Sequence, residues 1–271
     1  MQTQASGINR LEAAKGARRT VLEMLASSKA SHLGSNMSVI EILIAMYSSV
    51  DCGQIKSGNP SRSRVVISKG HCAAATYAVL SQFGLLSMNL LESYHKDDSL
   101  LAGHVSHMVP FVEHSTGALG HGINVAVGCA IGLRSRGTYG SKVLTLVGDG
   151  EIQEGSVWEA IMLLGHLQLP NFVLLVDNNQ ISSIRRTSDV INMQPLAKRF
   201  EAFDLLTHEV DGHSIDEICN AIAEIGSSLR PGVVICNTTK GKGVRFAEHD
   251  PVWHYRTLNA ELLAQALADL A

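Results

Sequence analysis

Two short polar segments follow apolar runs of strand length and could together bind a divalent cation. Gly148-Asp149-Gly150-Glu151 follows the run 143–147, and Asp177-Asn178-Asn179-Gln180-Ile181-Ser182 follows the run 172–176. The carboxyl ends of parallel strands meet at one edge of a sheet, so we expect both segments at that edge. The Asp149 carboxylate and the Asn179 amide oxygen are hard ligands suited to Mg²⁺ or Ca²⁺. One carboxylate does not make a tight cation site, so phosphate oxygens of a cofactor would complete it, and the glycines beside Asp149 would let a diphosphate approach.

Histidines form the second chemical feature, because imidazole can both donate and accept a proton near neutral pH. Four of the 12 histidines lie in short motifs: Ser31-His32-Leu33-Gly34-Ser35, Ser68-Lys69-Gly70-His71, Gly103-His104 and Trp253-His254. We expect His121 to lie near the site, and the other seven, His213 among them, to serve packing or the surface. The histidine spacing does not match a zinc site, and no G-x-S-x-G motif indicates a serine nucleophile.

The elements that must position these residues alternate between strands and helices. Continuous apolar runs occur at 64–67, 143–147, 172–176 and 233–236, and helical apolar spacing occurs from Ile8 to Leu25, from Val39 to Met46 and from Asn259 to Leu270. Continuous apolar strands separated by helices are typical of a parallel sheet that is covered on both faces. The sequence therefore predicts one α/β domain over residues 1–271, with a parallel sheet flanked by helices on both faces.

The composition excludes several classes of function. The 271 residues carry 22 Lys and Arg against 25 Asp and Glu, a net charge of −3, so no basic field favours nucleic acid or a membrane surface. No apolar stretch approaches the roughly 20 residues that span a bilayer, and the first residues do not resemble a secretory signal. The five cysteines are odd in number and lack C-x-x-C spacing, which indicates reduced thiols of a cytoplasmic protein.

The spacing from Gly148-Asp149-Gly150 to Asn178-Asn179 resembles the cofactor motif of thiamine diphosphate enzymes. The four histidine motifs, together with Ser115-Thr116-Gly117-Ala118-Leu119-Gly120-His121-Gly122 and Lys240-Gly241-Lys242-Gly243, resemble one branch of these enzymes, the transketolases. The order and spacing are similar over nearly the whole chain to the N-terminal, diphosphate-binding part of a transketolase. The resemblance implies the thiamine diphosphate-binding fold and the transfer of a two-carbon ketol unit from a ketose to an aldose.

The resemblance also implies a role for each matching residue. Asp149, Asn179 and the backbone carbonyl of Ile181 would bind Mg²⁺, for which Ca²⁺ or Mn²⁺ could substitute. The residues expected to contact thiamine diphosphate are Ser35, Lys69, His71, Gly117, Ala118, Leu119, Gly150, Glu151, Asn179, Lys240 and His254. Three histidines, His32, His104 and His254, would line the substrate channel, bind sugar hydroxyls and move protons as the ketol bond breaks and forms.

A transketolase also needs a pyrimidine-binding domain, whose glutamate activates the cofactor, and no glutamate of this chain matches that role. We therefore expect a second polypeptide that carries this domain, with two copies of each subunit and a sugar or sugar phosphate as substrate. The glycine-rich segment Gly120–Gly132 allows two interpretations. It is either a helix packed tightly inside the domain, or a helix packed against another subunit beside a bound ligand.

The sequence departs from the transketolase pattern at Val105, at Ser182–Arg186 and at Tyr255-Arg256. These departures leave the predicted cofactor site intact and bear on which substrate the chain would bind. Two alternatives stay open at this point. One is another thiamine diphosphate enzyme, such as the α subunit of a 2-oxo acid dehydrogenase or a deoxyxylulose-phosphate synthase. The other is a non-catalytic relative that only binds a partner.

Overall fold

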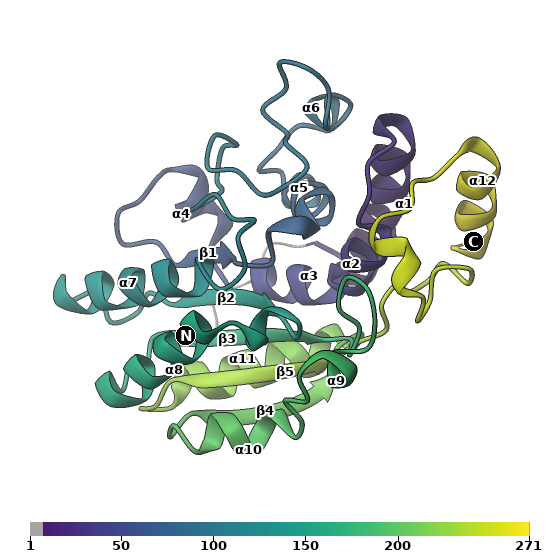
Figure 1. The fold of residues 1–271 in the computed structure, drawn as a ribbon. Helices are drawn as coiled ribbons and strands as arrows, with labels where there is room; N and C mark the ends of the chain where they lie inside the picture. The colour runs from purple at the N-terminus through teal and green to yellow at the C-terminus, as the bar shows by residue number, and fades with distance from the viewer. Residues whose placement is uncertain (1–7, 271) are drawn as a thin grey trace.

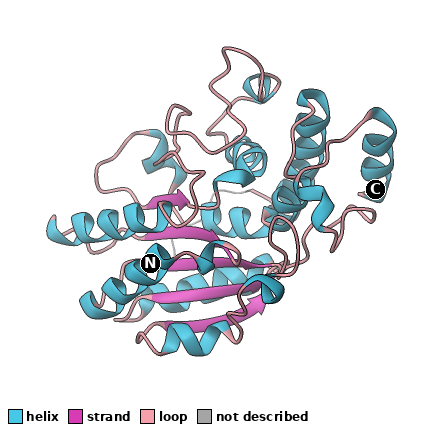
Figure 2. Ribbon diagram, in the orientation of Figure 1, coloured by secondary structure: helices cyan, strands magenta, loops and turns pink. Residues whose placement is uncertain are grey.

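The fold is built on a parallel sheet, seen here in a computed structural model that describes residues 8–270. The strand order is β1-β2-β3-β5-β4, and every neighbouring pair is parallel. The strands are β1 (Arg64–Ile67), β2 (Val143–Gly148), β3 (Phe172–Asn178), β4 (Leu206–Asp211) and β5 (Gly232–Asn237). All the strands point the same way, so the loops that follow them gather at one edge of the sheet (Figure 2).

Helices separate the strands along the chain and cover the sheet (Figure 1). The α-helices are α1 (Arg10–Ser28), α2 (Leu33–Ser38), α3 (Ile40–Ser48), α4 (Cys52–Lys56), α5 (Ala73–Gln82), α6 (Met88–Leu91), α7 (Gly122–Ser135), α8 (Gly155–Leu167), α9 (Thr187–Val190), α10 (Leu196–Glu201), α11 (Ile215–Ser227) and α12 (Ala260–Asp269). The short 3₁₀ helices are η1 (Gly70–Cys72), η2 (Glu151–Gln153) and η3 (Pro251–His254). Polar side chains begin several of the helices: Asn9 caps α1 and Asn259 caps α12, each by accepting backbone N–H bonds of the first turn.

The two faces of the sheet pack into two separate apolar cores. Alternate strand residues point to opposite faces, so Leu144 and Leu146 of β2 join the core formed with α1, α3, α5 and α11. Val143 and Val147 of the same strand join the core formed with α7, α8 and α10. The four strands predicted from continuous apolar runs and the coverage of both faces are thereby confirmed.

β4 is the strand that the sequence pattern did not reveal. It lies at the edge of the sheet, paired only with β5 among the described strands, and its residues are half-buried or exposed. A strand with this environment needs no continuous apolar run, and Leu206–Asp211 reads as a mixture of polar and apolar residues.

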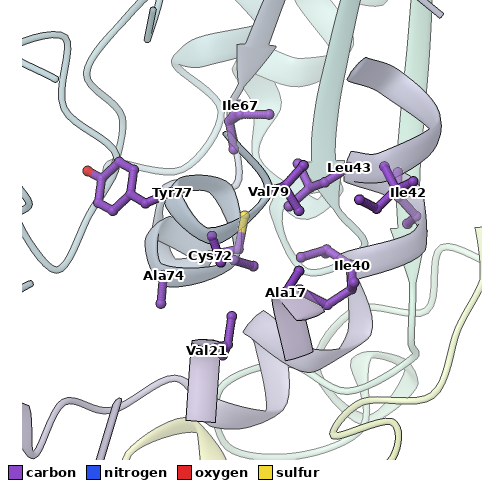
Figure 3. Close-up of a cluster of buried hydrophobic side chains, with 14 of the residues drawn as sticks. Ala17, Val21, Ile40, Ile42, Leu43, Ile67, Cys72, Ala74, Tyr77 and Val79 are labelled. Atoms are coloured by element: carbon purple, nitrogen blue, oxygen red, sulfur yellow. The ribbon is translucent and has the colours of Figure 1, made fainter. Parts of the chain in front are cut away.

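The larger core contacts one of the histidine-bearing segments. Ala17 and Val21 of α1, Ile40 and Leu43 of α3, and Val79 of α5 meet there (Figure 3), all with exposed fractions of 0%. Tyr77 of α5 points its hydroxyl away from this cluster (Figure 3) and donates a hydrogen bond to the carbonyl of His104 at 3.1 Å. The core therefore supports the loop that carries His104.

No helix among residues 8–270 has the length and apolar character required to cross a bilayer.

Candidate active site at the carboxyl edge of the sheet

A cavity of about 390 Å³ opens at the carboxyl edge of the sheet and brings the predicted residues together. Its lining includes these residues from the sequence prediction: His32, Ser35, Lys69, His71, His104, Gly117, Leu119, Asp149, Gly150, Glu151, Asn179, Ile181, Lys240 and His254. Ala118 lies in the exposed turn between Gly117 and Leu119. Ser182, Ser183, Ile184 and Tyr255, where the sequence departs from the transketolase pattern, also line the cavity. Two of the three departures therefore reach the site itself, whereas Val105 is buried and does not line the cavity.

Asp149 and Asn179 stand at the ends of neighbouring strands, because β2 pairs with β3 and places Gly148 opposite Asp177. The Asp149 carboxylate accepts hydrogen bonds from the backbone N–H groups of Gly150, at 2.8 Å, and of Gln180. The Asn179 amide oxygen accepts a bond from the N–H of Ile181 at 3.0 Å. Burial and, secondly, the negative charge of Asp177 raise the pKa of Asp149 to about 7. A divalent cation beside Asp149 would balance the carboxylate charge and so remove the free-energy cost of burying it in ionised form.

Asp177, which the sequence analysis left without a role, is a centre of the buried polar network. Its carboxylate accepts bonds from Lys69, from Thr238, from Ser38 at 2.7 Å and from the Asn179 amide nitrogen at 3.0 Å. Because the amide nitrogen of Asn179 donates this last bond, the orientation of the amide group is fixed and its oxygen points away from Asp177. Burial alone would raise the pKa of Asp177, but the Lys69 charge and these hydrogen bonds hold it below its ordinary value. The sequence carried one signal for this role: Asp177 is a charged residue at the end of an otherwise apolar strand.

Lys69, which is predicted to contact the cofactor, lines the cavity and is also held by partners within the chain. Its ammonium group is paired with Asp177 and donates to the Ser35 carbonyl at 3.2 Å, and the side chain is 2% exposed. The structure thus gives Lys69 a partner within the chain, next to His71 and the cavity.

Lys240 crosses from the loop after β5 to the predicted cation site. Its ammonium group donates to the carbonyls of Ile181 at 3.0 Å and Ser182 at 2.6 Å. Burial, followed by repulsion from Lys69, lowers its pKa to about 8. The carbonyl of Ile181, predicted as a cation ligand, is therefore accessible to a positive group.

Glu151 joins the glycine-rich turn to the sheet. Its carboxylate accepts bonds from Ser68, from the N–H of Gly120 at 2.9 Å and from the N–H of Gly148 at 3.2 Å. Burial is the main cause that raises its pKa. These three bonds hold the cavity wall in place, and Glu151 is itself part of the cavity lining.

The glycine-rich segment is packed inside the domain at its start, as the first interpretation predicts, and is open further along. A Cβ atom on Gly122 would lie 2.7 Å from the Cα atom of Ser68, so α7 begins in close contact with the end of β1. Gly128 and Gly132 face outward, and no described atom lies within 4 Å of a Cβ atom built on either. The first turn of α7 is thus packed inside the domain, while its outer face is open.

Four imidazole rings cluster at the mouth of the cavity. The His32 ring lies 4.9 Å from His254, 5.4 Å from His104 and 5.5 Å from His71, measured between ring centroids. His32 adopts a left-handed backbone conformation, with φ of 72°, and its N–H donates to the His254 carbonyl at 3.0 Å. This bond joins segments from opposite ends of the chain.

Burial keeps these histidines uncharged. It is the main cause that lowers the pKa of His32 to about 4 and of His254 to about 3, with repulsion from His104 and Lys240, respectively, as the second cause. The pKa of His71 is lowered by burial and Lys69, and the pKa of His104, which is more exposed, by burial and His95. Neutral imidazoles can bind and orient hydroxyl groups as donors or acceptors.

The donor set suits a cation held jointly by protein and cofactor. Within residues 8–270, no group of three or more His, Cys, Asp or Glu side chains could hold a metal ion. The oxygens at the site come instead from one carboxylate, one amide and one carbonyl. Hard oxygen donors of this kind suit Mg²⁺ with phosphate oxygens as further ligands. The residues present therefore fit a magnesium diphosphate group.

The fold and the site together match one family of known proteins. Residues 9–270 match the family model described as transketolase, thiamine diphosphate binding domain. The chain belongs to the transketolase family.

Relatives of the same length are named as subunits of transketolases. The chain is 38% identical over 260 residues to a protein of Actinobacillus succinogenes named as a subunit of an apulose-4-phosphate transketolase, and the match covers 95% of this chain and 94% of that protein. It is 31% identical to "6-deoxy-6-sulfo-D-fructose transketolase subunit SqwG" of a Clostridium species, over 93% of each chain.

Solved transketolases are longer but contain the same fold. The Campylobacter jejuni enzyme superposes with a TM-score of 0.87 at 29% identity, covering 98% of this chain and 43% of that one. The Pichia stipitis enzyme in complex with sedoheptulose 7-phosphate superposes with a TM-score of 0.88 at 27% identity, covering 96% and 40%. This chain spans about two-fifths of these solved chains. The predicted family and fold class are confirmed, and these comparisons do not favour the two alternatives.

Proposed function

We propose that this chain is the thiamine diphosphate-binding subunit of a Mg²⁺-dependent transketolase, which transfers a two-carbon ketol unit from a ketose to an aldose. The observation that carries the proposal is the single cavity that joins the oxygens of Asp149, Asn179 and Ile181 to the four-histidine cluster. Cation site and proton-transfer groups are thus within one small volume.

The residues of the chain divide the work of binding. Asp149, Asn179 and the Ile181 carbonyl hold the cation, while Gly150 and the turn Gly117–Leu119 lie against the diphosphate. Ser35, His71 and Lys240 contact the cofactor, and Lys240 adds the positive charge that one Mg²⁺ does not supply. When bound, thiamine diphosphate supplies the carbon centre that accepts and donates the two-carbon unit.

The histidines act on the substrate. His32, His104 and His254 are held as neutral imidazoles at the mouth of the cavity, so each can bind a sugar hydroxyl and accept or return its proton. The relatives act on sugars with an acidic end group, a phosphate in one name and a sulfonate in the other. We infer a ketose with an anionic terminal group as the substrate.

We infer that the partner is a second polypeptide with the pyrimidine-binding domain, present in two copies with two copies of this chain. The names of the relatives, each of which is one subunit of a transketolase, support a partner. So does the open outer face of α7 and α8, where Val125, Met162 and Leu163 expose 36%, 56% and 41% of their surface. All five cysteines are free in the described structure, which supports a cytoplasmic location.

Reconstitution tests the proposal. The purified chain with Mg²⁺ and thiamine diphosphate should not transfer a two-carbon unit, and addition of the partner should restore transfer with an interface on the order of 2,000 Å² or more. Transfer by the isolated chain would contradict the two-subunit proposal. Oxidative decarboxylation of a 2-oxo acid by the complex, without ketol transfer, would favour the first alternative.

A further inference from the structure

A buried cluster outside the cavity connects three distant segments of the chain. We call Arg18 of α1, Glu41 of α3 and His213 of the β4–α11 loop the Glu41 cluster. The Arg18 guanidinium binds both Glu41 carboxylate oxygens, at 2.5 and 2.6 Å, and Nδ1 of His213 lies 3.1 Å from Glu41 Oε2. The side chains of Arg18, Glu41 and His213 are 10%, 11% and 15% exposed. Burial by itself raises the pKa of Glu41, but the His213 bond and the Arg18 charge bring it below its ordinary value, so the carboxylate is ionised.

The other ring nitrogen of His213 reaches the loop after β5. Nε2 accepts a hydrogen bond from the backbone N–H of Thr239 at 2.8 Å. A nitrogen that accepts a bond carries no proton, so the proton of the neutral ring is on Nδ1 and is donated to Glu41. The ionised carboxylate of Glu41 selects this tautomer, and the tautomer in turn provides the acceptor for Thr239.

Thr239 directly precedes Lys240, whose ammonium group binds the carbonyls of Ile181 and Ser182 beside the cation site. Thr238 is held from the other direction by its bond to Asp177. The backbone that leads into Lys240 is therefore held by Asp177 and by His213, and beyond Lys240 the N–H of Gly241 donates to the Gly34 carbonyl at 2.9 Å. Lys240 itself is 1% exposed, and its side chain lies across Gly34, where a Cβ atom would meet its Cγ at 3.0 Å. The buried Lys240 side chain has little room to compensate for a shift of the Thr238–Thr239 backbone, so we expect such a shift to displace its ammonium group.

We propose that His213 is a positioning residue for the diphosphate site: its Nε2 atom holds the Thr239–Lys240 turn, and Glu41 holds the ring in the tautomer that this requires. The inference rests on the proposed function, because Lys240 is assigned there to the cofactor. His213 itself does not line the cavity and contacts neither cofactor nor substrate in this assignment.

Two variants separate the two bonds of the imidazole. In His213→Asn the amide can reproduce Nδ1 and donate to Glu41, but it cannot reach Thr239. In His213→Gln the longer side chain can place an acceptor where Nε2 lies, while the bond to Glu41 is lost. Each variant loses one of the two bonds, so a purely structural role predicts similar behaviour of the two proteins.

The measurements are calorimetric affinity for thiamine diphosphate with Mg²⁺ in the complex with the partner, and amide hydrogen exchange of the full chain without cofactor. We expect His213→Asn to weaken cofactor affinity about tenfold, the usual scale of one lost hydrogen bond, and to speed exchange at Thr239 and Lys240. His213→Gln should keep affinity and exchange close to those of the wild type.

Equal affinities in His213→Asn and the wild type would overturn the inference, as would equal weakening in both variants. If the wild-type complex does not bind thiamine diphosphate with Mg²⁺, the proposed function fails. Hydrogen exchange would then still decide separately whether His213 holds the turn, and unchanged exchange in His213→Asn would overturn that as well.

Discussion

The middle of the sheet and its carboxyl edge are buried to the same degree but are stabilised in different ways. In the middle of β3, Val173, Leu174 and Leu175 are 0% exposed and contact other apolar side chains. At the end of the same strand, Asp177 is also 0% exposed, yet it needs Lys69, Ser38, Thr238 and Asn179 as partners. An apolar core tolerates substitutions between side chains of similar volume, whereas each polar group at the edge depends on a particular partner. We therefore expect single substitutions of polar groups at the edge to lower function or stability.

Asp149→Ala should give the largest effect, because it removes the one carboxylate of the proposed cation site. We expect no measurable Mg²⁺-dependent binding of thiamine diphosphate in the complex, measured by calorimetry. The free energy of unfolding of the free chain should fall much less than the cofactor affinity. Burial of the carboxylate is unfavourable in the folded chain, as its pKa of about 7 indicates, so its removal costs the fold little. Unchanged affinity with Mg²⁺ present would contradict the assignment of Asp149.

Lys69→Met tests the buried ion pair, because it leaves Asp177 charged without its cation. Breaking such a pair costs about 3–5 kcal/mol, and urea denaturation at neutral pH would measure the loss. Lys15→Met is the matched control: Lys15 lies 3.2 Å from Glu12 but is 72% exposed, and exposed pairs contribute about 0–1 kcal/mol. Similar losses in both variants would show that the carboxyl edge does not depend on this pair.

The histidine cluster should make stability depend on pH. The folded chain holds the pKa of His32 at about 4 and of His254 at about 3, both below the ordinary value of 6.5. Between these values the unfolded chain binds more protons, so stability is present above pH 6.5 and is lost as the pH falls toward 4. Denaturation of the wild type and of a His32→Asn/His254→Gln variant between pH 7.5 and 5 would measure this, with a smaller loss expected in the variant. Equal slopes would show that the two rings titrate normally in the folded chain.

Thr145→Val should give the smallest effect, and one of opposite sign. Thr145 lies in β2 with 0% exposure, and its hydroxyl has no hydrogen-bond partner among the described residues. Replacing an unpaired buried hydroxyl by a methyl group should stabilise the chain by about 1 kcal/mol in denaturation experiments. Ile161→Val, in the core on the same face, is the control and should lose about 0.5–1.5 kcal/mol. A stability loss in Thr145→Val would indicate that the hydroxyl has a partner, such as a buried water.

The sequence by itself determined the fold class and which residues meet at the proposed cation site. Continuous apolar runs of this length, separated by helical segments, are strands buried on both faces. Parallel strands bring their ends together, so Asp149 and Asn179 had to meet once β2 and β3 were neighbours. The edge strand β4 could not be predicted in the same way, because a half-exposed strand carries no continuous apolar pattern. The family, too, could be predicted from motifs whose order is preserved along the chain.

Only the tertiary structure decided which buried groups pair with one another. Lys69 follows a strand end, and only the fold shows that its ammonium group pairs with Asp177, 108 residues away in sequence. His213 had no motif to distinguish it from a surface histidine, and its bonds to Glu41 and Thr239 come from the packing of α3 beside α11 and of β4 beside β5. Local sequence determines where a strand or helix begins and ends, whereas a hydrogen bond requires two atoms within about 3 Å. That distance is set by how distant elements pack, which spacing along the chain does not encode.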